Sequence, residues 1–96
     1  CRIDIYNLSD SDVWVHGLFN SNEQLSFPIS WRDKAAHAVY LENMWARGGC
    51  DDGMFINVVK WPEGYTIYSN YTYTNSVVYL VPWLGQSGIK AEVKSK

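Results

Sequence analysis

The residues best suited to chemistry lie in one short stretch near the middle of the chain. Arg47 is followed by two glycines, Cys50 and the adjacent aspartates Asp51 and Asp52. A planar guanidinium is suited to bidentate hydrogen bonding with carboxylates and hydroxyls, so these residues are candidates for a ligand cleft. They could also form an ion pair that orders the turn. We favour the structural interpretation, and the sequence leaves both open.

The spacing of the two aspartates argues against catalysis. Glycoside hydrolysis needs two carboxyl groups about 5 to 9.5 Å apart across a cleft. Neighbouring residues on a strand point to opposite faces, and in a turn they more often cap backbone N–H groups. The sequence also lacks a Gly-x-Ser-x-Gly elbow and a Cys–His nucleophile pattern. We therefore expect a protein that is not an enzyme and has no cofactor.

A metal site is not expected either. His16 and His37 fall on predicted strands, opposite the apolar faces, and have no ligand spacing relative to each other or to a cysteine. The segment 10–12 (Asp-Ser-Asp) is too short for a calcium loop and is typical of a turn.

The surplus of aromatic residues is the more informative feature. The chain has five Trp and seven Tyr, more than the inward positions of a few short strands easily hold. Trp and Tyr side chains with one exposed edge form sugar-stacking platforms and protein hot spots. We therefore expect an exposed aromatic binding surface that includes Trp61, Tyr68 or Trp83. The alternative is an aromatic core with ordinary surface tyrosines.

Composition indicates one folded domain over residues 1–96. The chain is 47% hydrophobic and 16% aromatic, too apolar for a disordered segment and long enough for a single core. Its net charge is −2 and its basic residues are scattered, which disfavours a nucleic-acid partner. No apolar run approaches the roughly 20 residues of a membrane span. We expect a monomer.

The two cysteines predict a disulfide between Cys1 and Cys50. It would close a loop of about 50 residues and contribute roughly 4 kcal/mol in the chain-entropy model, against a total stability of about 5–15 kcal/mol. Together with the sequons that begin at Asn7 and Asn70, it indicates a secreted, extracellular protein. A lipidated Cys1, or free thiols in a cytosolic protein, are the alternatives.

Alternating and apolar-rich stretches bounded by turn residues predict seven or eight short strands. They cover residues 2–6, 13–19, 24–31, 37–45, 54–61, 65–74, 77–81 and 89–94. We expect the first two to form a hairpin, Asn75-Ser76 to be a hairpin turn, and 77–81 to be central in a sheet because it is apolar on both faces. Residues 32–36 have helical composition but are too few to form a helix alone. The fold class is all-β, a small antiparallel β-sandwich of about six to eight strands, with a small barrel as the alternative.

The first half of the chain resembles the opening of thaumatin-like proteins. The resemblance covers roughly residues 1–55 and lies in an ordered set of short motifs: Ile3-Asp4-Ile5-Tyr6-Asn7, Val13-Trp14-Val15, Gln24-Leu25, Ser30-Trp31 and Trp45-Ala46-Arg47-Gly48-Gly49-Cys50-Asp51-Asp52. That family is longer and richer in cysteine, so the resemblance implies a minimal sandwich core. It also implies a defence-type protein that binds cell-wall polysaccharide, with Arg47 in the cleft and Asp51 and Asp52 as candidates beside it.

A looser resemblance is to small secreted fungal effectors with a single-disulfide β-sandwich, on the length and on the positions of Cys1 and Cys50. It implies binding to a host protein. The sequence therefore leads to a secreted binding protein for a polysaccharide, with an effector-type protein as the second hypothesis and a small glycoside hydrolase as the third.

Overall fold

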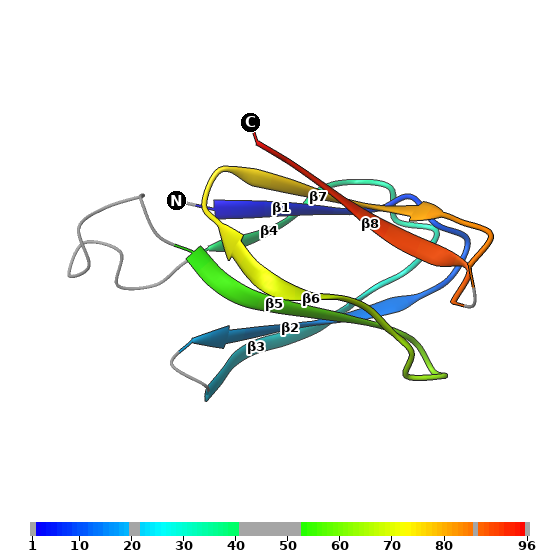
Figure 1. Ribbon diagram of the computed structural model, residues 1–96, viewed down its shortest axis with the longest axis horizontal. Helices are drawn as coiled ribbons and strands as arrows, with labels where there is room; N and C mark the ends of the chain where they lie inside the picture. The colour runs from blue at the N-terminus through cyan, green and yellow to red at the C-terminus, as the bar shows by residue number, and fades with distance from the viewer. Residues whose placement is uncertain (1, 20–21, 41–52, 86, 96) are drawn as a thin grey trace.

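The chain folds into two four-stranded β-sheets packed face to face (Figure 1). The computed structural model describes residues 2–19, 22–40, 53–85 and 87–95. Within these ranges there are eight strands and no helix: β1 Arg2–Asn7, β2 Val13–Phe19, β3 Asn22–Ile29, β4 His37–Tyr40, β5 Gly53–Lys60, β6 Thr66–Tyr73, β7 Ser76–Pro82 and β8 Ile89–Ser95. The all-β sandwich expected from the alternation is confirmed. In this part of the chain no helix is long and apolar enough to cross a membrane.

The strand order is β4-β1-β7-β8 in one sheet and β3-β2-β5-β6 in the other. Five of the neighbouring pairs are antiparallel, while β1 and β7 run parallel. This one parallel pair differs from the antiparallel arrangement expected from the sequence. The strand predicted at 77–81 lies in β7, between β1 and β8, so its central position is confirmed.

The buried apolar side chains of the two sheets form one core. Its fully or nearly fully buried members alternate along the strands, as the period of two requires. They are Ile3, Ile5, Val39, Val78, Leu80 and Ile89 from one sheet, and Val13, Val15, Ile29, Met54, Ile56 and Val58 from the other. In the strand predicted at 37–45, Val39 is buried in this core, and residues 41–45 lie outside the described residues.

The predicted hairpin between the first two strands is wrong. β1 and β2 belong to different sheets, so residues 8–12 carry the chain across the sandwich. The reason is Asn7, whose side chain is fully buried and donates to the carbonyl oxygens of Ser11 and Ile29. These hydrogen bonds fix residues 8–12 as a connection between the two sheets, whereas a hairpin turn within one sheet was expected.

The predicted hairpin at Asn75-Ser76 is also wrong. β6 and β7 lie in different sheets. Asn75 has a φ of 63°, in the left-handed region that Asn tolerates, and its N–H donates to the carbonyl of Arg2 at 3.0 Å. The turn chemistry was recognised, but the turn links the two layers.

Candidate functional site

Three connections meet at one end of the sandwich, on the right in Figure 1: those between β1 and β2, β5 and β6, and β7 and β8. Between them is an open hollow of about 520 Å³, which we call the loop-end hollow. Asp10 and Ser11 line it from the first connection, Lys60 from the end of β5, and Trp83 and Leu84 from the third. Segments far apart in the sequence therefore build one concave surface.

Trp83 also lines a second, smaller hollow. This one has a volume of about 250 Å³, and its other lining residues are Tyr65, Thr66 and Ser87. The Trp83 side chain is 54% exposed, so part of the indole is open to a ligand. The ring thus borders two depressions that differ in charge. One carries the charged groups of Asp10 and Lys60, and the other carries hydroxyl groups.

The connection between β7 and β8 fixes the position of Trp83. The Trp83 N–H donates to the Gly88 carbonyl at 2.9 Å, and the Gly88 N–H donates to the Gly85 carbonyl at 3.0 Å. Gly88 has a φ of +76°, which glycine adopts without strain. A Cβ added at Gly85 would overlap the Trp83 ring. The indole therefore lies directly against the Gly85 backbone, in space that only glycine leaves free.

The charged side of the loop-end hollow is held by a tight turn after β5. Lys60 Nζ lies 3.2 Å from Glu63 Oε2, and the Gly64 N–H donates to the Lys60 carbonyl at 2.6 Å. The Lys60 N–H in turn donates to the Tyr65 carbonyl at 2.7 Å. Because Glu63 balances the charge of Lys60, the hollow can offer donors and acceptors without a strong field of one sign.

On the opposite side of the hollow, a buried polar cluster holds the segment with Asp10 and Ser11. Asn7 Oδ1 accepts hydrogen bonds from the Ser9 N–H at 3.2 Å and the Ser9 hydroxyl at 2.5 Å. Lys34 Nζ donates to the Ser9 carbonyl at 2.9 Å. These contacts fix the shape of the segment that presents Asp10 and Ser11 to the hollow.

Trp61, the second candidate aromatic residue, lies on another surface. Its ring packs against Trp14, with centroids 5.2 Å apart and planes at 50°. Trp14 alternates with the buried Val13 and Val15, so it lies on the outer face of its sheet, where its Nε1 donates to the hydroxyl of Ser26. Trp61 is 49% exposed there, and Trp83 lines the hollow. The two therefore do not form one aromatic group.

Tyr68, the third candidate, points into the sandwich. It is half-buried, packs against the core, and its hydroxyl shares a 2.7 Å hydrogen bond with Thr72 Oγ1. The exposed tyrosines of β6 are Tyr71 and Tyr73, whose rings meet edge to face at 5.2 Å. Tyr68 thus contributes to packing at the sheet edge, away from Trp83.

The other sequence candidates lie outside the described residues. These are Arg47, Asp51 and Asp52, together with the cysteines of the predicted disulfide, Cys1 and Cys50. The Arg–Asp cleft and the disulfide stay predictions.

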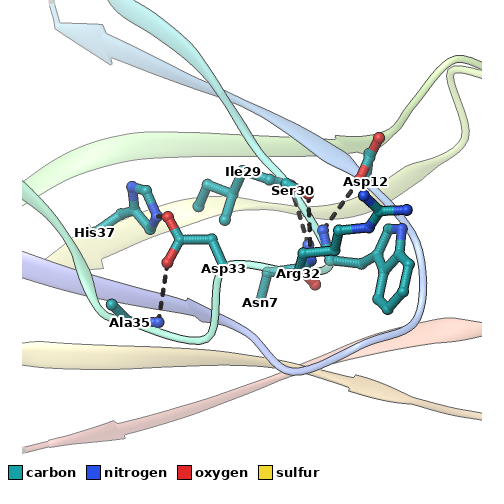
Figure 2. A network of polar contacts seen from close by, with 9 residues as sticks. Asn7, Asp12, Ile29, Ser30, Arg32, Asp33, Ala35 and His37 are labelled. Atoms are coloured by element: carbon teal, nitrogen blue, oxygen red, sulfur yellow. Dashed lines mark hydrogen bonds and ion pairs between the residues drawn. The ribbon is translucent and has the colours of Figure 1, made fainter.

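The two histidines contact protein side chains. His16 Nδ1 lies 3.3 Å from the hydroxyl of Ser26. His37 Nε2 lies 2.8 Å from Asp33 Oδ2 (Figure 2), and its ring stacks on Phe27 at 6.1 Å. Both positions suit structural roles in the sheets.

Asp33 organises the connection between β3 and β4, where helical composition was noted (Figure 2). Its N–H donates to the Ser30 carbonyl at 3.0 Å, and its Oδ1 accepts from the Ala35 N–H at 3.1 Å. The Ala35 hydrogen bond, followed by the hydrogen bond and charge of His37, holds the pKa of the Asp33 carboxyl below its ordinary value. The segment forms turns stabilised by this carboxylate.

The sequence was compared with protein-family models and with curated proteins, and neither comparison found a match. The functional argument therefore depends on the geometry of the loop-end hollow. Of the residues that line this hollow and the smaller one beside it, sequence reasoning identified Trp83. It missed Lys60, Tyr65 and Ser87, and it treated Asp10 and Ser11 as turn residues. The available signal was that each of these lies in or beside a predicted turn.

Proposed function

We propose that the protein is a secreted, non-enzymatic binding protein that holds a cell-wall polysaccharide at the loop-end hollow. The observation that carries the proposal is the position of Trp83, half-exposed between two depressions lined by hydrogen-bonding groups. A sugar ring presents an apolar C–H face to an indole and hydroxyl groups at its rim. An aromatic platform flanked by polar side chains is therefore complementary to it.

The two hollows suit a chain that crosses Trp83. On one side, the Asp10 carboxylate can accept hydrogen bonds from sugar hydroxyl groups, and the Lys60 ammonium can donate to them. On the other side, Tyr65, Thr66 and Ser87 offer hydroxyl groups, which serve as donors and acceptors. The ion pair between Lys60 and Glu63 reduces the attraction for polyanions, so we propose a neutral polysaccharide. The thaumatin-like resemblance of residues 1–55 supports the same ligand class, with Arg47, Asp51 and Asp52 as a proposed second contact.

A pull-down on insoluble β-glucan, chitin and cellulose tests this function. We expect the parent to be retained on at least one of them, and Trp83→Ala to lose most of that retention. Trp61→Ala is the matched control, because it removes an indole of similar exposure from the neighbouring surface. Retention of Trp83→Ala at the parental level, or retention of the parent on none of the three, would overturn the proposal.

One observation favours the effector-type alternative, in which the same end of the sandwich binds a host protein. Leu84 is fully exposed beside Trp83, and an exposed leucine next to a tryptophan is typical of a protein-binding patch. Leu84→Ser separates the two functions. It should weaken polysaccharide retention much less than Trp83→Ala does, whereas it should weaken a protein complex centred on this pair by about tenfold or more.

A further inference from the structure

The sheet edges of the sandwich are protected unequally. Four of the described strands lie at edges: β4 and β8 in one sheet, β3 and β6 in the other. Exposed edges pair with other chains unless they are short, charged or interrupted by proline. β3 contains Pro28, and β8 alternates Lys90, Glu92 and Lys94 with its apolar side chains. Each of these two edges has a recognised protection against pairing.

β6 has none of these features. It spans eight residues, Thr66–Tyr73, with no charged residue, no proline and no glycine. Six of the eight are Tyr, Thr or Ile, the residue types that favour strands most. Its pairing with β5 shifts register at Val58/Val59, opposite the start of β6, and is regular from Tyr68 to Tyr73. β6 is therefore a long, uncharged edge with strong strand propensity.

The backbone groups that face outward can be assigned. The Tyr71 N–H donates to the side-chain oxygen of Asn70 at 2.9 Å, so it points away from β5. Backbone groups alternate in an antiparallel pair, so those of Ser69 and Tyr73 also face the open side. The Asn70 amide provides the Tyr71 N–H with a partner that an incoming strand can replace.

We propose that β6 pairs antiparallel with β6 of a second copy of this chain, joining the two outer sheets into one continuous sheet. A twofold axis near Asn70 would place Ser69 opposite Tyr71, so that outward-facing groups meet outward-facing groups. The same register sets Tyr68 opposite Thr72, with no like charges facing each other. Such a contact is self-complementary, as a twofold interface must be.

The absence of charge on β6 favours a second copy over a foreign peptide. A foreign strand is usually selected by charge or by side-chain pockets. β6 offers no charge to select one, while an identical strand is present at the concentration of the protein itself. Pairing would also cover part of Tyr73, which is 65% exposed. This dimer replaces the monomer expected from the sequence.

The dimer does not depend on the proposed polysaccharide site. Of β6, Thr66 alone lines either of the two hollows described above, and the register centred on Asn70 uses the strand from Ile67 onward. Both copies would keep their hollows open. Two sites on one particle would raise the apparent affinity for a repeating ligand by avidity.

Sedimentation velocity from micromolar to millimolar concentration tests the pairing, with protein from bacteria so that Asn70 carries no glycan. We expect the parent to dimerise, and Asn70→Lys to weaken dimerisation at least tenfold because two ammonium groups would meet at the axis. High salt should partly restore the Asn70→Lys dimer, since it screens the repulsion; a folding defect would not respond in this way. Ala36→Lys is the matched control, because it adds the same charge at an exposed position in the connection between β3 and β4, on the other side of the sandwich.

Hydrogen exchange locates the interface. Dimerisation should slow exchange of the amides of Ser69, Tyr71 and Tyr73 and leave those of β8 unchanged. A parent that stays monomeric at the highest concentration would overturn the proposal and leave a foreign extended peptide as the occupant of this edge. Equal weakening by Ala36→Lys, or protection of β8 in place of β6, would also overturn it.

Discussion

The side chain of Asn7 donates a hydrogen bond from its Nδ2 to the carbonyl oxygen of Ile29, at 3.1 Å and across 22 residues of sequence. It joins the end of β1 in one sheet to the end of β3 in the other. The same amide donates to the Ser11 carbonyl at 2.9 Å, and the side chain is fully buried. One polar side chain therefore links the two layers and shapes the connection that lines the loop-end hollow.

Replacing Asn7 should destabilise the fold. Asn7→Ala would leave the buried carbonyls of Ser11 and Ile29 without these donors, at a cost of about 2–3 kcal/mol in the free energy of unfolding. Urea denaturation measures it, with Asn70→Ala as a control at an exposed position, where a change within about 0.5 kcal/mol is expected. A loss at Asn7 no larger than that of the control would contradict the structural role.

The two sequons should differ in glycosylation. Both polar groups of the Asn7 amide are hydrogen-bonded inside the protein, so a glycan on Nδ2 is incompatible with the fold. Asn70 is exposed on an edge strand. In a eukaryotic secretory host, peptide mass mapping of the folded product should find a glycan at Asn70 and none at Asn7, and this product should stay monomeric because the glycan would block pairing at Asn70. A folded product with a glycan on Asn7 would show that the connection between β1 and β2 can form without the hydrogen bonds of the Asn7 side chain.

Lowering the pH should remove the stabilisation that the ionised Asp33 carboxylate provides. Its folded-state pKa is lowered, first by the Ala35 N–H and then by His37, so the ionised carboxylate is favoured by folding. This contribution is present above the unfolded-state pKa of about 3.9 and disappears as the pH falls through the lowered folded-state value. Melting temperatures of the parent and Asp33→Asn should therefore differ at neutral pH and converge well below pH 4. A constant gap at every pH would exclude this carboxylate as the cause.

Strand positions were largely predictable because alternation is a local property. Residues 13–19 were predicted as a strand, and β2 has those bounds. At two connections, after β1 and after β6, the sequence did not predict which sheet the next strand joins. Short polar segments such as 8–12 identify a turn, but they do not say whether the chain returns in its own sheet or crosses to the other. Here the choice depends on Ile29, far away in sequence from Asn7.

The candidate site was predictable only in part, for a related reason. Trp83 was a candidate because the chain has more Trp and Tyr than the inward positions of its short strands easily hold. Lys60 and Asp10 could not be joined to it from the sequence, since only the order of strands in two sheets brings their connections together. Tyr68 shows a second limit. Alternation in β6 separates two faces, but hydroxyl-bearing residues on both faces conceal which one is inward.

The contact between Gly85 and Trp83 allows the strongest test of the hollow. Gly85→Ala would force the indole to move, because the added methyl group would occupy its position. We expect polysaccharide affinity to fall by up to about tenfold, since aromatic contacts contribute about 0.5–1.5 kcal/mol beyond area burial. Isothermal titration with a soluble oligosaccharide of the bound polysaccharide measures the loss. If Gly85 acts through the ring alone, the double variant with Trp83→Ala should bind no more weakly than Trp83→Ala itself. Additive losses would show that the connection contacts the ligand independently of the indole.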